Sequence, residues 1–329
     1  MIGPAYRPHT PLERAPGTTQ TRPIGNLRGN LGNSRAMGGE TLDIRPLSGA
    51  LGAEIAGVDL AQALDDGPLG ETALAEIRRA LDRHLVVAFR GQDLSPGQQI
   101  ALTRRLGPLL RVPFIEPLAE HPEIVAVLKE AEERGISTFG GVWHSDFSFL
   151  EAPPSYTLLY ALEVPATGGD TIWANMSLAY ATLSDGMKDL PRGLRALHSG
   201  VPYGTHGPPS DLRVSTSVKM ARGDPAADAE VAHPVVRRHP ETGADALFVN
   251  PTYTTRFEDM TAAESRPLLD TLQTHATRAE LTCRLRWRAG TLVIWDNRAT
   301  QHLAVNDYDG QRRLLHRTAV TGERPLPAG

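Results

Sequence analysis

The sequence predicts a mainly β fold with inserted helices, of the double-stranded β-helix or jelly-roll class. Short strand-like runs, about ten by the usual signals of alternation and β-branched content, are spread over the 329 residues. They do not alternate regularly with helices, as a doubly wound parallel sheet would require. No internal repeat is visible. Two antiparallel sheets packed face to face therefore describe the chain best.

The first 39 residues differ in composition from the rest of the chain. They are rich in glycine, proline, threonine and arginine, carry Glu13 as their sole acid, and show no apolar periodicity. This composition predicts a disordered tail at residues 1–39, because such a segment has no apolar face to bury. Residues 40–329 are therefore expected to form a single jelly-roll domain.

The first half of this domain is predicted to hold two helices among its strands. Apolar residues recur at helical spacing within residues 71–84. Ser95 and Pro96 are a capping residue and a first-turn proline, so they are expected to open the second helix. Strands are predicted at residues 41–47, 53–60, 85–89, 124–128, 140–150, 155–164 and 170–174.

The second half combines short helices, a long insert and the closing strands. One or two short helices are predicted over residues 177–197. The polar segment 199–232 has little periodicity, and it is interpreted as a lid or wall of a substrate pocket, or as a disordered insert. Thr261 and Glu264 form a capping box that starts a further helix. Strands are predicted at 233–239 and 246–250 as one hairpin, at 282–287 and 291–295 as a second, and at 313–320.

Composition limits the classes of partner. The chain has 38 acidic and 34 basic residues, a net charge of −4, so it lacks a positive field for nucleic acid or anionic membranes. No run is long enough to span a bilayer, and no signal peptide is visible. The single cysteine, Cys283, cannot form an internal disulfide. We expect a cytoplasmic protein with a small-molecule partner, and a homo-oligomer is compatible with the sequence.

His144 and Asp146 are the pair on which the functional interpretation depends. They are two residues apart among apolar and aromatic neighbours, so on an extended strand both side chains point to the same face. With a second histidine they would form a three-ligand face on Fe(II) that leaves positions open for substrate and oxygen. Taken alone, a His-x-Asp tripeptide also occurs by chance on ordinary strands, so the motif is a hypothesis.

His302 is the best candidate for the third ligand. It follows the apolar run 291–295 and is expected in a polar loop at the rim of the barrel. Further along, Arg313 and Arg317 are four residues apart, so an extended strand places both on one face. Two guanidinium groups directed into one cavity imply anionic ligands, because their planar forks match carboxylate or sulfonate oxygens.

Five motifs, taken in this order and spacing, resemble the Fe(II)/2-oxoglutarate-dependent dioxygenases of the taurine dioxygenase and 2,4-dichlorophenoxyacetate dioxygenase family. The motifs are His144-x-Asp146, Gly168-Gly-Asp-Thr171, Trp295-Asp-Asn-Arg298, His302 and the Arg313/Arg317 pair. Each motif is weak alone, but the five together cover residues 41–325, which is essentially the whole predicted domain.

The resemblance implies a role for each matching residue. His144, Asp146 and His302 would be the Fe(II) ligands and the catalytic residues. Thr171 and Arg313 would bind the distal carboxylate of 2-oxoglutarate, and Arg317 would hold the acidic group of the primary substrate. The implied reaction consumes O2 and hydroxylates a C–H bond, while the protein positions that bond and excludes water.

The resemblance leaves the substrate open. Taurine-specific members hold their substrate with a histidine, a tyrosine and an asparagine, whereas Val112, Ile115 and Gly140 take these places here, which predicts a more apolar pocket. Residues 144–154, 216–219 and 260–265 look like the branch that cleaves aryloxypropionates, so an aryloxyalkanoate is the preferred substrate class. An alkyl sulfate or alkanesulfonate is the alternative. A non-oxidative metal-dependent enzyme or a binding module on a jelly roll is the alternative from a different class.

Overall fold

The computed structural model describes residues 42–65, 70–206 and 216–329. The predicted tail at residues 1–39 lies outside these described residues, as does part of the predicted insert 199–232. Residues 41–329 form one compact unit.

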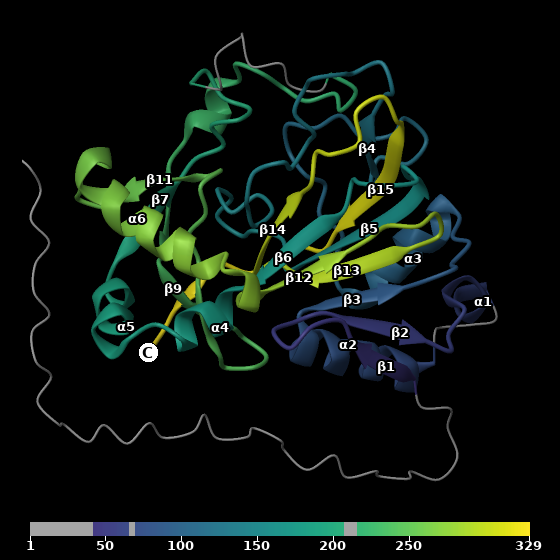
Figure 1. The fold of residues 1–329 in the computed structure, drawn as a ribbon, viewed down its shortest axis with the longest axis horizontal. Helices are drawn as coiled ribbons and strands as arrows, with labels where there is room; N and C mark the ends of the chain where they lie inside the picture. Colours follow the sequence, from purple (N-terminus) through teal and green to yellow (C-terminus); the bar gives the residue numbers. More distant parts are fainter. Residues whose placement is uncertain (1–41, 66–69, 207–215) are drawn as a thin grey trace, which may run out of the picture. The chain divides into compact units, whose positions relative to one another are not determined.

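A seven-stranded sheet is the framework of the unit (Figure 1). Its strand order is β1-β2-β3-β13-β5-β15-β4, antiparallel except for the β2–β3 pair. Its central strands β13 and β5 are apolar and buried along most of their length, as expected of strands covered on both faces. The strands are β1 (Asp43–Pro46), β2 (Ala53–Ala56), β3 (Val86–Phe89), β4 (Val125–Lys129), β5 (Tyr156–Glu163), β13 (Leu292–Asp296) and β15 (Arg313–Ala319).

A three-stranded sheet packs against the inner face of the large one. Its order is β12-β6-β14, with β12 (Thr282–Leu285), β6 (Thr171–Asn175) and β14 (Thr300–Ala304). Trp173 of β6 meets Trp295 of β13 with ring centroids 5.8 Å apart, and the surrounding cluster contains Leu285 from one sheet and Leu159 and Leu315 from the other. This apolar layer between two antiparallel sheets confirms the predicted jelly-roll class.

Helices cover the outer face of the large sheet. They are α1 (Leu60–Asp65), α2 (Glu71–His84) and α3 (Pro96–Leu106). Ile77 and Leu102 pack there against Val87, Leu158 and other sheet residues. Both predicted helices of this half are confirmed, and α3 starts at the predicted Ser95 with a complete capping box.

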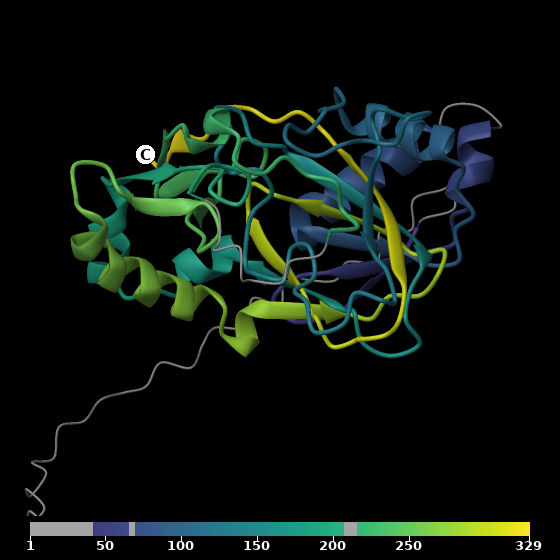
Figure 2. The same ribbon diagram turned by 90° about the horizontal axis from the view of Figure 1, so that it is seen from above.

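The remaining elements gather at the other end of the unit, which Figure 2 shows from above. Helix α6 carries the predicted Thr261 capping box, and β9 and β10 form the predicted hairpin. The helices are α4 (Met176–Ala181), α5 (Asp185–Arg192) and α6 (Ala262–Ala276), with 3-10 turns at Pro225–Asp228 and Ala279–Leu281. The strands are β7 (Arg195–His198), β8 (Val231–Pro234), β9 (Val236–Arg238), β10 (Asp245–Leu247), β11 (Thr254–Phe257) and β16 (Leu326–Pro327).

The segment 140–150 is not the predicted strand. It forms turns, and its sole pairing is an isolated bridge between His144 and His302. Phe147 adopts a positive φ of 45°, and the Leu150 N–H donates to the Phe147 carbonyl over 3.0 Å. Because the backbone reverses at this point, it cannot continue a ladder. The prediction of a strand ending at Pro153 was therefore wrong.

The predicted hairpin of 282–287 with 291–295 was also wrong. Strand β12 pairs with β6 in the small sheet, whereas β13 lies between β3 and β5 in the large one. All five residues of β13 are buried, so this strand needs a partner on each side, and the chain crosses between sheets instead of turning back. The predicted strand 53–60 is also shorter than expected, because α1 begins at Leu60.

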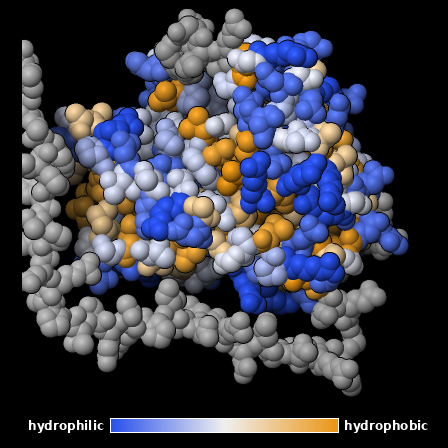
Figure 3. All heavy atoms as spheres, viewed as in Figure 1, coloured by the Kyte–Doolittle hydropathy of each residue, from blue (hydrophilic) through white to orange (hydrophobic). Residues whose placement is uncertain are grey.

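The surface carries apolar side chains in small groups among hydrophilic ones on the face drawn in Figure 3. The large apolar residues with the highest exposure are spread along the sequence, from Ile44 through Val142 to Leu326. Apolar side chains form no extended patch among the described residues visible in this view. Among the described residues, none of the helices has the length and hydropathy needed to cross a bilayer.

Candidate metal centre

His144, Asp146 and His302 lie together in the buried space beside the two sheets. One potential ligand atom from each residue lies within 4.8 Å of the other two. The Nε2 atoms of His144 and His302 are 3.7 and 3.9 Å from the same oxygen, Asp146 Oδ1. Two residues 158 positions apart in the sequence are thus brought to one point.

The backbone fixes the two histidines relative to each other. The His144 N–H donates to the His302 carbonyl over 3.0 Å, and the His302 N–H donates to the His144 carbonyl over 2.8 Å. His302 lies in strand β14, so its predicted placement in a loop was wrong. The strand is a stiffer support than a loop, because β14 is held along its length by β6.

The electrostatic environment keeps both imidazoles neutral and the carboxylate ionised. Burial lowers the pKa of His144 and lowers the pKa of His302 well below its usual value. Burial alone would raise the pKa of Asp146, but the charge of Arg317 and the hydrogen bond from Thr157 help to leave that pKa below its usual value. Neutral nitrogens with lone pairs and an ionised oxygen are the forms that bind a metal cation.

The donor set fits a divalent iron ion. Two imidazoles and one carboxylate on one side of a buried point form the facial arrangement of non-haem Fe(II) sites. His144 Nδ1 lies 2.7 Å from the Val142 carbonyl, and that contact places the ring proton on Nδ1 and leaves Nε2 free for a metal. The residues present therefore suit the metal that the sequence implies.

A buried guanidinium group, that of Arg313, borders the same small cavity as these three residues. Arg313 is 3% exposed, its Nε donates to the Gly169 carbonyl over 3.2 Å, and its Nη2 has no hydrogen-bond partner among the described residues. Burial lowers the pKa of Arg313 to about 10, and it remains a cation at neutral pH. A buried cation with an unused donor calls for an anionic ligand.

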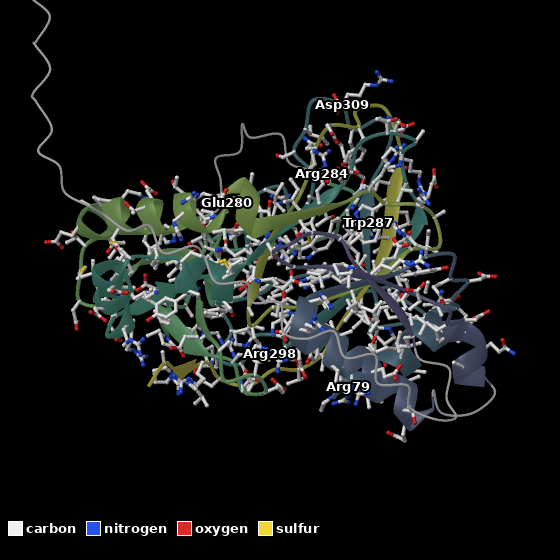
Figure 4. The ribbon with its side chains drawn as sticks, turned by 60° about the horizontal axis from the view of Figure 1, so that its bottom comes forward. Arg79, Glu280, Arg284, Trp287, Arg298 and Asp309 are labelled. Atoms are coloured by element: carbon white, nitrogen blue, oxygen red, sulfur yellow. The ribbon has the colours of Figure 1, made fainter. Side chains whose placement is uncertain are left out.

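Thr171 lines the same small cavity as Arg313. Its Oγ1 accepts a hydrogen bond of 2.9 Å from Trp287 Nε1, and Figure 4 labels Trp287 in the segment that follows β12. Because an indole N–H can only donate, the Thr171 hydroxyl must direct its own proton elsewhere. Trp287 was not singled out from the sequence, where it resembles any other apolar strand residue.

Arg317 lies between Asp146, one of the three clustered residues, and the aromatic ring of Phe147. It is 4% exposed, its Nη2 lies 3.0 Å from Asp146 Oδ1, and its guanidinium carbon lies 4.9 Å above the Phe147 ring. Neither Nη atom makes a hydrogen bond of good geometry to a described residue. Arg317 therefore keeps donors available for a second anion.

Most of the predicted site residues line one common cavity. A small cavity of about 40 Å³ is bordered by seven of the nine predicted site residues, namely Gly140, His144, Asp146, Thr171, His302, Arg313 and Arg317. Val112 and Ile115 do not border it. They line a separate cavity of about 220 Å³ that shares Arg317.

A larger chamber adjoins the small cavity at His144. It has a volume of about 400 Å³ and is mostly apolar. Gly140 and His144 border both this chamber and the small cavity. Its wall includes Pro202, Tyr203 and Met220 from segment 199–232, which the sequence suggests as a pocket wall or lid. Val142, Pro251 and Tyr253 also line it, and the sequence did not predict them as wall residues.

A jelly roll that brings two imidazoles and a carboxylate together beside two buried arginines has the architecture of non-haem Fe(II) oxygenases. The sequence profile described as "Taurine catabolism dioxygenase TauD, TfdA family" matches residues 43–319. The chain belongs to this dioxygenase family. The predicted class, an Fe(II)- and 2-oxoglutarate-dependent dioxygenase, is confirmed.

Individual relatives cover most of the chain. An "Alpha-ketoglutarate-dependent sulfate ester dioxygenase" from Pseudomonas putida is 37% identical over 87% of this chain and 91% of its own length. An "Alpha-ketoglutarate-dependent 2,4-dichlorophenoxyacetate dioxygenase" from Cupriavidus pinatubonensis is 34% identical over 84% and 96%. The crystal structure of a taurine dioxygenase from Burkholderia xenovorans superimposes with a TM-score of 0.71 at 34% identity, covering 87% and 93%. The non-oxidative and binding-module alternatives lose their support.

Proposed function

We propose that this dioxygenase hydroxylates a C–H bond next to the ester oxygen of a small organic sulfate, which then fragments into an aldehyde and sulfate. The observation that carries the proposal is Arg317, a buried guanidinium with unused donors beside the clustered His144, Asp146 and His302. An organic anion that pairs with Arg317 brings its adjacent carbon close to these three residues. The planar guanidinium suits the oxygens of a sulfate or a carboxylate.

The geometry supports a role for each polar residue. His144, Asp146 and His302 would hold Fe(II), which supplies oxygen activation coupled to decarboxylation of 2-oxoglutarate to succinate and CO2. Arg313 would pair with the distal carboxylate of 2-oxoglutarate, and the Thr171 hydroxyl, oriented by Trp287, would donate to the same group. Both contacts orient the cosubstrate and cost little reorganisation, because these side chains are already buried and held.

The apolar walls position the body of the substrate and exclude water. The 400 Å³ chamber that borders Gly140 and His144 is large enough for an alkyl or aryl group, and Val112 and Ile115 line the cavity on the other side of Arg317. We propose that these three residues contribute to substrate selection. Gly140 has a φ of 75°, and a Cβ there would lie 3.2 Å from the His144 ring, so a side chain at this position would press on the proposed ligand.

The fragmentation balances without a further reagent. One O2 and one 2-oxoglutarate are consumed, one oxygen atom enters succinate, and the other forms the new hydroxyl on the substrate carbon. That hydroxyl then loses its proton while the carbon–oxygen bond to sulfate breaks, which releases an aldehyde. The protein needs only to place the correct C–H bond at the centre.

An aryloxyalkanoate, the class preferred from the sequence, is the second candidate. The aromatic cluster beside Arg317 favours it, because Phe147 and Tyr203 stack with ring centroids 6.1 Å apart and Phe114 lies 5.6 Å from Tyr203. The same hydroxylation next to an ether oxygen would release a phenol. Relatives of both kinds are similar to this chain, and the one at 37% identity acts on sulfate esters.

The test is a substrate panel with purified protein, Fe(II) and 2-oxoglutarate. Alkyl sulfates, aryloxyalkanoates and alkanesulfonates are compared by succinate, sulfate, phenol and sulfite release. We expect equimolar succinate and sulfate with a medium-chain alkyl sulfate, and no turnover by His144→Ala. If an aryloxyalkanoate is turned over to a phenol with a higher kcat/KM than an alkyl sulfate is turned over to sulfate, the aryloxyalkanoate replaces the organic sulfate as the proposed substrate class. Succinate formation unaffected by any of these anions would refute both.

The cellular setting is also a proposal. The single cysteine, Cys283, is buried, and burial raises its pKa to about 12, so it has little reactivity as a thiolate. A chain without a disulfide and with an oxygen-sensitive Fe(II) centre suits a reducing compartment. We propose that the enzyme works in the cytoplasm.

A further inference from the structure

Asp146 uses its two carboxylate oxygens differently. Oδ1 is the oxygen that both histidine Nε2 atoms approach, at 3.7 and 3.9 Å. Oδ2 instead accepts a hydrogen bond of 2.7 Å from the hydroxyl of Thr157. Thr157 lies on β5 of the large sheet and is completely buried. The carboxylate is therefore held through its second oxygen by the framework of the fold.

The Thr157 hydroxyl is in turn held by Asn297. Asn297 Nδ2 lies 2.8 Å from Thr157 Oγ1, and Asn297 Oδ1 lies 2.9 Å from Trp295 Nε1. The same Oδ1 accepts the backbone N–H of Asp146 over 3.3 Å. Trp295 and Asn297 are each 2% exposed. Four buried hydrogen bonds thus connect the large sheet to the backbone and side chain of one residue.

Trp295 determines which group donates and which accepts in each of these side-chain hydrogen bonds. Its indole N–H can only donate, so the amide of Asn297 must present its oxygen to Trp295 and its NH2 group to Thr157. Thr157 Oγ1 then accepts from Asn297, and its single proton is left for Asp146 Oδ2. The orientation of a side-chain amide is ambiguous in isolation, but here the indole settles it.

We propose that Trp295, Asn297 and Thr157 form a positioning relay for Asp146, which keeps Oδ2 occupied so that Oδ1 alone is presented to the metal. The inference rests on the proposed metal-binding role of Asp146. The three residues do not touch substrate, so they are positioning residues.

The charge distribution explains why the relay is needed. Arg317 Nη2 lies 3.0 Å from Asp146 Oδ1 and attracts the oxygen that faces the histidines. Without a partner on Oδ2, the carboxylate could turn and offer both oxygens to the guanidinium, away from the metal. A hydroxyl donor on Oδ2 opposes that rotation and adds no charge to the buried site. Loss of such supporting hydrogen bonds typically weakens metal binding by about 10- to 100-fold.

The experiment measures metal binding without turnover. Metal-free full-length protein is titrated with Co(II) under anaerobic conditions, in the absence of 2-oxoglutarate and substrate, and binding is followed by the visible d–d absorption. Thr157→Val removes the hydroxyl and keeps the side-chain volume, whereas Thr157→Ser retains the hydroxyl. The matched control is Thr291→Val, another completely buried threonine of the large-sheet region, whose hydroxyl accepts from Arg90.

The relay predicts a specific order of affinities. We expect Thr157→Val to bind Co(II) about 10- to 100-fold more weakly, with an altered absorption spectrum at saturation, while Thr157→Ser and Thr291→Val stay close to the unmodified protein. Equal affinity and an identical spectrum for Thr157→Val would overturn the relay. If the unmodified protein binds no Co(II), the metal site itself fails and the relay fails with it.

Asn297→Asp gives an independent test if Thr157→Val does not fold. The new carboxylate cannot donate to Thr157, so the Thr157 hydroxyl would be drawn toward residue 297 and away from Asp146. We expect weaker Co(II) binding in that variant too. Affinity unchanged from the unmodified protein would contradict the proposed direction of the bonds.

Discussion

The two arginines of β15 differ in what surrounds their guanidinium groups. Arg313 is tied to the Gly169 carbonyl and lies 5.8 Å from the Trp287 ring, close to Thr171. Arg317 lies beside Asp146 and above Phe147, where the small cavity meets the cavity of Val112 and Ile115. We propose that the two guanidinium groups on this strand face bind two different anions.

Replacing each arginine by alanine should separate these functions. A hydrogen bond to a charged group is worth about 1.5–3 kcal/mol, so Arg313→Ala should raise the KM for 2-oxoglutarate by about 10- to 100-fold, by the rule of tenfold per 1.4 kcal/mol. Arg317→Ala should mainly raise the KM for the primary substrate by a similar factor. Steady-state kinetics with each cosubstrate varied in turn checks both. Equal effects of the two substitutions on both ligands would contradict the assignment.

Trp287 should act on 2-oxoglutarate through Thr171. Trp287→Phe removes the indole donor, so the Thr171 hydroxyl is free to rotate, and we expect the KM for 2-oxoglutarate to rise about fivefold, within the range of a neutral hydrogen bond. Trp173→Phe is the matched control, because the buried Trp173 N–H has no hydrogen-bond partner among the described residues. Similar KM values for the two variants would remove the role assigned to Trp287.

At the residue scale, the sequence led to those site residues whose chemistry is visible without a structure. His144, Asp146, His302 and Arg317 are polar residues in apolar surroundings or at strand spacing. Thr157 could not be found in this way, because a threonine in an apolar strand is an ordinary β-former. Its role depends on which side chains the fold brings to its hydroxyl.

Among the elements, helix starts were predictable because their signals are local. Helix α6 begins where the sequence indicates, since the Thr261 hydroxyl accepts from the Glu264 N–H and the Glu264 carboxylate accepts from the Thr261 N–H. Strand partners were not predictable in the same way. The contiguous runs 282–287 and 291–295 belong to different sheets, and that choice depends on burial of β13 against strands 130 or more residues away.

The α6 cap makes a prediction for stability. Thr261→Ala removes the side-chain acceptor of the capping box, so the free energy of unfolding should fall by about 1 kcal/mol. Thr271→Ala is the control within the same helix, because Thr271 is exposed and its hydroxyl donates back to the Pro267 carbonyl. Urea denaturation measures both. If Thr271→Ala lowers the free energy of unfolding as much as Thr261→Ala does, the lost capping box does not explain the destabilisation.

At the scale of the whole molecule, we propose that residues 40–329 form a single domain, with segment 199–232 as part of the pocket wall. Pro202, Tyr203, Met220 and Arg222 from this segment border the 400 Å³ chamber, which supports a role in substrate enclosure. The same segment also contains Val231, the first residue of β8. Strand β8 pairs with β7, and β7 pairs in turn with β11. The segment that lines the pocket is thus continuous with the three-stranded sheet β11-β7-β8.

Two buried histidines in this sheet should set the response of the whole fold to acid. His198 of β7 and His233 of β8 are completely buried, with ring centroids 5.4 Å apart. His198 Nδ1 contacts the Ser148 hydroxyl at 3.0 Å, and His233 Nε2 contacts the Leu150 carbonyl at 2.9 Å. Burial lowers the pKa of His198 to about 3 and of His233 to about 4. Both are therefore neutral in the folded protein down to moderately acidic pH.

The sign of the pH dependence follows from proton counting. An unfolded histidine titrates near 6.5, so between pH 6.5 and 4 the unfolded chain binds more protons than the folded one, and stability falls as the pH is lowered. Each histidine should lower the free energy of unfolding by about 2 kcal/mol at pH 5, which lies 1.5 pH units below the pKa of an unfolded histidine.

A variant without these two histidines tests their contribution. The double variant His198→Asn with His233→Gln retains the polar contacts but does not titrate. Its urea midpoint should fall less between pH 7 and pH 5 than that of the unmodified protein. A double variant with the same acid sensitivity as the unmodified protein would mean that other groups control it.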